Sequence, residues 1–526
     1  MEHIKATSHP VHMSPRVRRR LLLALCLGIF ACNLPASTAT PVFPTAVTFA
    51  SPSLTPTLAV PLATPTPAYR PVFEPAACAF PVPPGYSPEC GYLIVPENRA
   101  RPDARSIRLH VAIFRNRSGS PIPDPVIHLA GGPGSSSLDV AGYLFSQSLD
   151  AILERRDFIL FDQRGTGYSQ PRLDCPERAD VISTLLGGGL SPEQTQQVIL
   201  DAFRRCRERL LAAGIDLSAY HSAASAVDLN DLRLALGYEK LNLYAVSYGT
   251  RLALTLMRDH PQAVRSAVLD SAYPLQVNLY TSLAPNADRA FNVFFSRCAA
   301  DPNCSTAYPD LRLVFYGLVD ELNARPVTVS LPAGGAERTV KLDGGLLIDV
   351  LFVGLYNPAV TASMPGMIFD IRQGDYGILR DRLALYFDTS SALGMQMAVQ
   401  CAEEFPFNAR EEAYAAAQNV QPQIAAFYPL SVQPLFAVCR EWPSTPPDPR
   451  EKLPVSGDVP ALVLAGEHDP ITPPDWGRMV AADLSNAYFH EFPANGHWVT
   501  RSSHCALQMA LAFWENPDGD PGFICQ

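Results

Sequence analysis

Short apolar runs alternate along the chain with segments whose apolar residues recur at helical spacing. Four such runs are bounded by turn residues, as is typical of buried parallel strands, at 126–129, 158–161, 241–245 and 267–269. Between them, 223–236 and 250–259 carry the helical pattern, and Gly237 ends the first of these two segments. Strand alternating with helix predicts the α/β class, with a mostly parallel central sheet covered by helices on both faces.

The alternation stops after Asp270. The part that follows has mainly helical periodicity with Pro and Gly interruptions, and strands resume only at 461–465 and 488–492, before a last helix at 505–514. A helical segment inserted between two stretches of one sheet predicts a cap domain. The expected boundaries are 77–285 and 443–526 for the core and 286–442 for the cap.

The N-terminus has the features of an export signal. Basic residues precede an apolar stretch at 21–31 that is too short to span a bilayer, and this combination predicts a signal peptide over 1–31. The stretch ends in a sequence that resembles a bacterial lipobox, in which Cys32 would be acylated, although Phe30 is bulkier than that motif usually has. Ordinary cleavage near 36–39 is the alternative.

A linker is expected over 32–76. Most of this segment is Pro, Thr, Ser and Ala with almost no charge. Such a segment buries too little apolar surface to fold, and its prolines favour extended polyproline II conformations. We expect a spacer that holds the folded part of the protein away from a membrane or wall.

Composition narrows the range of partners. The chain has 526 residues, 47% of them hydrophobic, and a net charge of -10 without a long basic run outside the extreme N-terminus. A chain of this length and hydrophobic fraction can bury a large core. The negative net charge argues against nucleic acid as a partner. We expect membrane contact only through the N-terminal lipid anchor, and the sequence leaves the oligomeric state open.

The cysteines indicate an oxidising compartment. Of the 12 cysteines, Cys26 and Cys32 belong to the signal region, which leaves an even number in the rest of the chain. In an exported chain this favours disulfides over metal binding, and no Cys-x-x-Cys or His-x-x-x-His cluster supports a metal site. Sequence does not fix the connectivity, but neighbour pairing gives short loops closed by Cys78–Cys90, Cys175–Cys206, Cys298–Cys304, Cys401–Cys439 and Cys505–Cys525.

Ser247 is the predicted nucleophile. It lies between the strand at 241–245 and the helix at 250–259, with Gly249 two residues on. A sharp strand–turn–helix elbow projects a serine oxygen away from the backbone, where a base takes its proton. The usual pattern is Gly-x-Ser-x-Gly, and Ala245 replaces its first glycine. The alternative is a buried turn serine without a chemical role.

Two late loops supply the partners that a serine nucleophile needs. His497 follows the strand at 488–492 and is the predicted base, which accepts the serine proton and returns it to the leaving group. Asp469 follows the preceding strand and is the predicted acid, which orients the imidazole. Glu467 and Asp270 are the alternatives for the acid, and Asp270 is better explained as structural.

A glycine-rich turn follows the strand at 126–129. Gly131, Gly132 and Gly134 allow backbone N–H groups to approach a developing oxyanion closely. We predict an oxyanion hole made by the N–H groups of Gly132 and Tyr248.

The order of these groups along the chain identifies the expected fold. Ser247, Asp469 and His497 follow one another as in an α/β-hydrolase triad, and not as in chymotrypsin or subtilisin. The prediction is therefore an α/β-hydrolase fold with an inserted, mainly helical cap. Neither a metal nor an organic cofactor is implied.

Several motifs together resemble the proline iminopeptidase and tripeptidyl aminopeptidase family of serine peptidases. They are Gly-Gly-Pro-Gly at 131–134, Asp-Gln-Arg-Gly-Thr-Gly-x-Ser at 162–169, Val-Ser-Tyr-Gly-Thr at 246–250 and Gly-Glu-x-Asp-Pro-x-Thr-Pro at 466–473. The end of the chain, with Cys505 and Cys525, is similar to the C-terminal domain of the secreted tripeptidyl aminopeptidases. Ala245 departs from the family pattern, as does Ala130, where proline iminopeptidases have histidine.

The resemblance implies an exported exopeptidase that acts on the free N-terminus of peptides. It also implies that Glu403, two residues after Cys401, binds the substrate ammonium. Glu404 beside it completes an acidic pair and is expected to contribute, and a solvated helix face is the alternative for this pair. An esterase or lipase-like hydrolase is the alternative function, because fold and triad do not fix the substrate. A binding protein on a decayed hydrolase fold is a third class, and the intact triad argues against it.

Overall fold

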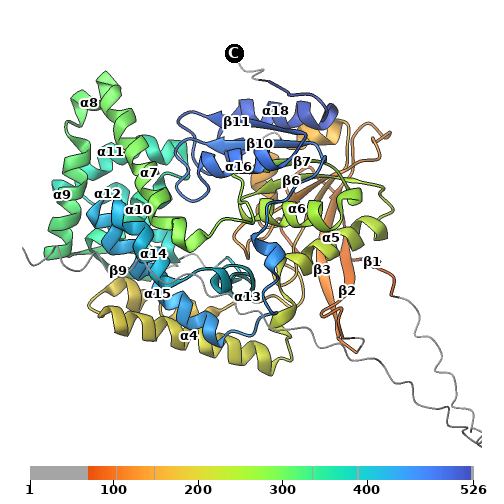
Figure 1. Cartoon of the computed structure of the whole chain (residues 1–526), viewed down its shortest axis with the longest axis horizontal. Helices are drawn as coiled ribbons and strands as arrows, with labels where there is room; N and C mark the ends of the chain where they lie inside the picture. Colours follow the sequence, from red (N-terminus) through yellow and green to blue (C-terminus); the bar gives the residue numbers. More distant parts are fainter. Residues whose placement is uncertain (1–68, 102, 147–148, 334–335, 388–389, 523–526) are drawn as a thin grey trace, which may run out of the picture. The chain divides into compact units, whose positions relative to one another are not determined.

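The computed structural model describes residues 69–101, 103–146, 149–333, 336–387 and 390–522 (Figure 1). The predicted signal peptide, Cys32, Cys525 and the part of the predicted linker before residue 69 lie outside these ranges. No helix within them is long and apolar enough to cross a membrane.

A nine-stranded sheet lies at the centre of the fold, in the order β1-β2-β3-β5-β4-β6-β7-β10-β11. Six neighbouring strands are parallel: β4 (Val126–Leu129), β5 (Phe158–Phe161), β6 (Leu241–Val246), β7 (Val264–Asp270), β10 (Ala461–Gly466) and β11 (Ala487–Phe492). Three strands at one edge are antiparallel: β1 (Val72–Pro75), β2 (Glu89–Pro96) and β3 (Ser106–Phe114). The predicted parallel sheet is confirmed.

Helices cover both faces of this sheet, because the central strands are apolar on both sides. Side chains alternate along β6, so that Leu243 packs on one face and Tyr244 on the other. The first face is covered by α5 (Ser222–Ala235), α6 (Tyr248–Asp259) and α16 (Pro474–Asp483). The second is covered by α1 (Ala141–Ser146) and α18 (His504–Glu515).

Between β7 and β10 the chain leaves the sheet and builds a mainly helical insertion with a hydrophobic core of its own. Its helices are α7 (Leu279–Ala300), α8 (Pro302–Ala307), α9 (Leu311–Ala324), α10 (Gly344–Gly354), α11 (Pro358–Arg372), α12 (Gly377–Ala384), α13 (Leu393–Glu403), α14 (Arg410–Ala416) and α15 (Pro422–Glu441). It also contains an antiparallel hairpin, β8 (Val327–Ala333) and β9 (Ala336–Leu342), which the helical interpretation of this segment missed.

A second excursion, between β5 and α5, packs against the same insertion. It contains α2 (Pro176–Asp180), α3 (Ile182–Gly187) and α4 (Pro192–Ala212), and α4 lies alongside α15 (Figure 1). Residues of this excursion share one hydrophobic cluster with α13 and α15. The cap is therefore built from two separate segments, whereas the sequence boundaries assigned the earlier one to the core.

Four of the five predicted disulfides are formed: Cys78–Cys90, Cys175–Cys206, Cys298–Cys304 and Cys401–Cys439. The fifth predicted pair includes Cys525, which is not among the described residues. Cys401–Cys439 joins α13 to α15, and Cys175–Cys206 joins the start of α2 to α4. Both bonds therefore fix elements of the cap to one another.

Candidate active site

Ser247 occupies the turn between β6 and α6, with a left-handed backbone at φ +58°. This conformation is costly for a residue with a side chain and is held by the surrounding packing. Glycine is required at position 249, because a Cβ there would overlap the carbonyl oxygen of Leu129. Ala245, the departure from the usual pattern, is fully buried inside β6. The elbow therefore forms with alanine in place of its first glycine.

His497 and Asp469 lie on loops that follow neighbouring parallel strands, β11 and β10. The Nδ1 atom of His497 is 2.8 Å from Oδ2 of Asp469. The other carboxylate oxygen accepts backbone hydrogen bonds from Ile471 (3.0 Å) and Thr472 (2.9 Å). These bonds fix the carboxylate so that Oδ2 faces the imidazole.

The surroundings of Asp469 favour its ionised form. Burial alone raises the pKa of this carboxyl, but the neighbouring imidazole of His497 and the hydrogen bonds from Thr472 outweigh burial and lower it below its usual value. A buried, ionised carboxylate beside Nδ1 would stabilise an imidazolium at His497, as the predicted role of His497 as a base requires.

The two alternative acids have other partners. Asp270 accepts hydrogen bonds from the backbone N–H groups of Val499 and Thr500, both at 2.8 Å, and so anchors the turn that follows His497. Glu467 pairs with Arg297 at 2.8 Å. Among these three carboxylates, only Asp469 is bonded to the imidazole.

Ser247 and His497 line one cavity of about 610 Å³, which lies between the carboxyl ends of the strands and the inserted helices. Gly132 and Tyr248, the predicted oxyanion donors, line it as well. Gly132 has φ +108°, a conformation that favours glycine, and Tyr248 is the first residue of α6, where N–H groups have no partner within the helix.

The glycine-rich turn is held against the nucleophile from behind. A Cβ at Gly131 would lie 2.8 Å from Cβ of Ser247, so the two segments are in direct contact. The amide of Gln163 donates to the carbonyl oxygen of Ala130 at 3.0 Å. The segment at 162–169 thus ties loops together beside the site.

Two residues of the site were not singled out from the sequence. The hydroxyl of Thr472 is 2.7 Å from Oδ2 of Asp469 and 3.1 Å from Nδ1 of His497. The ring of Tyr356, from the insertion, lies 4.7 Å from the His497 ring between centroids. Thr472 belongs to the motif around Asp469 and could have been weighed there, whereas no sequence pattern marks Tyr356.

The predicted amine ligands do not line the cavity. Glu403 accepts hydrogen bonds from the hydroxyl of Ser222 at 2.8 Å and from the guanidinium of Arg251 at 3.1 Å. Glu404 lies 3.3 Å from Arg251 and 3.4 Å from Lys452. Both glutamates are buried, so neither forms a solvated helix face, and Glu403 is engaged in an ion pair instead of facing a substrate.

Neutral polar groups line the cavity close to these glutamates. None of the described residues that line it has a carboxylate. Gln400 and Tyr273 do line it, but the Oε1 of Gln400 and the hydroxyl oxygen of Tyr273 are buried, and neither has a hydrogen-bond partner in the described structure. Burial and the nearby charge of Glu404 raise the pKa of Tyr273 well above its usual value. Glu404 therefore lies directly behind the cavity wall.

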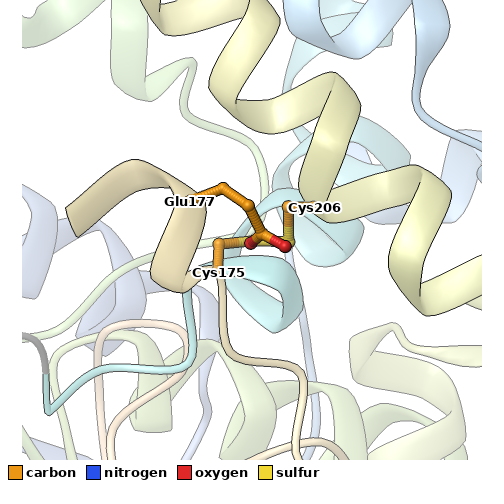
Figure 2. A group of neighbouring side chains, drawn as sticks. All are labelled: Cys175, Glu177 and Cys206. Carbon is orange, nitrogen blue, oxygen red and sulfur yellow. A yellow bond between two sulfur atoms is a disulfide. The ribbon is translucent and has the colours of Figure 1, made fainter. Parts of the chain in front are cut away.

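One cluster among the described residues has the composition of a metal site, namely Cys175, Glu177 and Cys206 (Figure 2). The two sulfur atoms form the disulfide described above, so they are not thiolates that could bind a metal. Glu177 pairs with Arg209 at 2.6 Å. The cluster is a structural crosslink.

Comparison with known proteins agrees with this geometry. Residues 124–335 match the family described as alpha/beta hydrolase fold, and residues 429–521 match the family described as TAP-like protein. Serine protease Hip1 of Mycobacterium tuberculosis is 27% identical over 458 residues, which cover 81% of this chain and 84% of that protein. Tripeptidyl aminopeptidase of Streptomyces coelicolor is 32% identical over 191 residues, 35% of each chain.

The chain is also similar to a protein that is named as an esterase. Carboxylesterase B of Mycobacterium tuberculosis is 26% identical over 423 residues, which cover 75% of this chain and 78% of that protein. Taken together, the two family matches, the peptidase relatives and the α/β-hydrolase architecture define the enzyme class. The chain is a serine hydrolase and belongs to the α/β-hydrolase serine peptidases of the tripeptidyl aminopeptidase family.

Proposed function

We propose that this enzyme is an exported serine exopeptidase that hydrolyses peptide bonds near the free N-terminus of peptides. The observation that carries the proposal is the bonded pair of His497 and Asp469 on the same covered cavity as the strained Ser247. The tripeptidyl aminopeptidase and serine protease relatives support a peptide substrate. The inserted helices on one side of the cavity support an exopeptidase, because they leave less room for a long chain on both sides of the scissile bond.

The reaction proceeds in two halves. Ser247 Oγ attacks the scissile carbonyl carbon while His497 accepts its proton, and the N–H groups of Gly132 and Tyr248 stabilise the oxyanion. His497 then protonates the leaving amine, and the acyl group remains on Ser247. Water, deprotonated by His497, hydrolyses this ester and releases the N-terminal fragment. Asp469 holds the imidazole in the required tautomer throughout.

Recognition of the substrate amine is the finer part of the proposal. An ammonium group has three donors and no acceptor. Gln400 and Tyr273 line the cavity, and each has a buried side-chain oxygen that a substrate amine would reach only after a change of rotamer. The carboxylate of Glu404 lies behind Tyr273, where the charges of Arg251 and Lys452 partly offset its negative potential. We assign amine binding to Gln400 and Tyr273 with Glu404 behind them, and a structural role to Glu403.

An esterase remains the second candidate. It is favoured by the similarity to carboxylesterase B and by the lack of a carboxylate among the described residues that line the cavity, because a neutral acyl group needs no anionic partner. The same triad and oxyanion donors would serve ester hydrolysis.

Export is proposed from two features. The predicted signal peptide and lipobox cysteine would deliver the enzyme to the outside of the cytoplasmic membrane. The disulfides in the folded part are expected in an oxidising compartment and seldom persist in a reducing cytosol. Peptides are the proposed partners of the exported enzyme, and nucleic acid is not.

A matched substrate panel tests the proposal. Prolyl and tripeptidyl arylamides are compared with their N-acetylated forms and with a short-chain aryl ester, under one set of conditions. The exopeptidase predicts turnover of the free-amino arylamides and strong loss on acetylation. Turnover of the ester without turnover of any arylamide would contradict the proposal and establish the esterase.

A further inference from the structure

A second cavity adjoins the active-site cavity inside the cap. It has a volume of about 550 Å³ and lies between the excursion that contains α2 and α4 and the helices α13 and α15. Gln396, Ser431 and Leu435 line both cavities. A substrate held at Ser247 therefore has a neighbouring space, with these three residues on the wall common to both cavities.

The wall of the second cavity is mostly apolar, with residues such as Ile182, Phe203 and Met397. Arg178 also lines it. Among the residues that the structure describes, no side chain makes an ion pair or hydrogen bond with its guanidinium, and burial lowers the pKa of Arg178 below its usual value. Desolvating a charge without a partner is costly, so its place on a cavity wall calls for an anionic occupant.

Neighbouring acids do not neutralise Arg178, because they are paired elsewhere. Asp174, which also lines this cavity, pairs with Arg172 at 2.6 Å, and Glu177 pairs with Arg209 at 2.6 Å. Neither Asp174 nor Glu177 therefore forms an ion pair with Arg178.

The turn that carries Arg178 is fixed in position. The disulfide Cys175–Cys206 joins the residue before α2 to α4, and Glu177 lies beside this bond (Figure 2). The pair between Glu177 and Arg209 adds a second link between α2 and α4. Because the backbone of α2 is fixed, only the side chain of Arg178 has to be ordered when a ligand binds, which favours affinity.

We propose that Arg178 binds a carboxylate of the substrate in this second cavity, so that the enzyme selects short substrates whose far end is acidic. This inference rests on the proposed function, since it needs a substrate that extends from Ser247 past Gln396 and Leu435. Guanidinium and carboxylate match as a bidentate pair. The carboxylate is either the C-terminus of a short peptide or an acidic side chain, and the test separates these two sources.

The test compares kcat/KM for matched substrates. In the first pair, a short peptide is supplied as the free acid and as the C-terminal carboxamide. In the second pair, both peptides are carboxamides, and one has Glu where the other has Gln; this pair is made for each position of the peptide. A parallel pair of aryl esters carries an acyl chain that ends in a carboxylate or a carboxamide. The enzymes are the wild type, Arg178→Gln, Arg178→Lys and Arg205→Gln, an exposed control on α4 that lines neither cavity.

The wild type is expected to prefer the carboxylate partner of at least one pair by about 10- to 100-fold, the usual strength of a charge-assisted bond. Arg178→Gln should reduce this ratio to about 1, mainly through KM, and leave the neutral partners unchanged. Arg178→Lys should keep part of the preference, and Arg205→Gln all of it. Preference in the acid–carboxamide pair identifies the C-terminus, and preference in the Glu–Gln pair identifies a side chain.

Two results would overturn the inference: no carboxylate preference in the wild type, or equal losses on charged and neutral substrates in Arg178→Gln. A failure of the proposed function is distinguishable, because no peptide would then be turned over while the esters are. In that case the ester pair alone decides whether Arg178 binds a carboxylate.

Discussion

At the scale of single residues, the Nδ1 atom of His497 has two oxygen atoms within reach, one from Asp469 at 2.8 Å and one from Thr472 at 3.1 Å. The hydroxyl of Thr472 also donates to the same oxygen of Asp469 at 2.7 Å. The carboxylate thus orients the imidazole, and the threonine orients the carboxylate. The two residues should differ in how much they matter for catalysis.

Asp469→Asn should lower kcat by about 10⁴-fold, because an amide cannot hold the imidazole in the required tautomer. Asp270→Asn should be much milder in kcat and should chiefly lower stability, because Asp270 anchors backbone N–H groups and not the imidazole. Steady-state kinetics and thermal unfolding of both variants test this. Equal losses in kcat, or a larger loss in Asp270→Asn, would show that Asp270 at the end of β7 acts as the catalytic acid.

Thr472→Val removes one hydrogen bond to Asp469 with little change in shape. We expect kcat to fall by about 10-fold, the value of one hydrogen bond to a charged group, with KM unchanged. An unchanged kcat would show that the hydroxyl does not orient the acid. A loss as large as that of Asp469→Asn would show that Thr472 is itself indispensable.

At the scale of elements, two loops support the oxyanion turn from behind. Asp162, which follows β5, is fully buried and accepts hydrogen bonds from the hydroxyl of Ser136 (2.9 Å) and the backbone N–H of Tyr168 (2.8 Å). Ser136 itself lines the active-site cavity. Burial raises the pKa of Asp162 to about 6, so the carboxyl that holds these loops changes its charge near neutral pH.

The titration of Asp162 predicts a pH dependence of stability. An aspartate in the unfolded chain has a pKa of about 3.9, so the folded state binds more protons between about pH 4 and pH 6. The resulting stabilisation is fully present below about pH 4 and is lost as the pH rises through about 6. The unfolding free energy of the wild type minus that of Asp162→Asn should therefore fall by about 3 kcal/mol between pH 4 and pH 7.

Denaturant titrations of both proteins across this pH range measure the difference in unfolding free energy directly. The contributions of the ionisable groups that both proteins share largely cancel in this difference. A difference that stays constant, or that grows with pH, would show that the pKa of Asp162 is not raised in the folded protein.

At the scale of the whole molecule, Arg251 connects the sheet to the insertion. It is 1% exposed on α6 and lies 3.1 Å from Glu403 at the end of α13 and 3.7 Å from Glu451, which precedes β10. A buried charge that loses its partner destabilises a protein far more than an exposed one does. Glu403 and Glu404 both pair with Arg251, so replacing either should lower the unfolding free energy, and the two should differ in their effect on substrate binding.

Glu403→Gln should lower the unfolding free energy by about 3 kcal/mol and leave KM nearly unchanged for every substrate. Glu404→Gln should raise KM for free-amino peptides several-fold and leave the aryl ester unaffected, because its charge acts through Tyr273. Unfolding curves and substrate kinetics of both variants separate the roles. An amine-specific rise in KM for Glu403→Gln would restore the role first assigned to that residue.

The features that sequence predicted well are those with local causes. Apolar runs produced the parallel strands, and the elbow around Ser247 and the turn after β10 are set by residues close in the chain. The partner of Glu403 is different, because Arg251 lies 152 residues away and becomes its neighbour only when α13 docks on α6. No sequence pattern predicts that contact.

The cap illustrates the same limit. Alternation at Val329 and Leu331, which are buried in β8, was overlooked beside the stronger helical periodicity around it. The excursion that carries Arg178 precedes the insertion by about a hundred residues, and only packing assigns it to the cap. The second cavity exists only between these two segments, so it was not predictable from either one.

The measurement that tests the central claim most directly is the turnover of a free-amino peptide arylamide by Ser247→Ala. With the nucleophile removed, kcat should fall on the order of a million-fold, while circular dichroism and thermal unfolding stay as in the wild type. A variant that keeps a tenth of wild-type activity would contradict the assignment of Ser247 and with it the serine peptidase mechanism derived from this site.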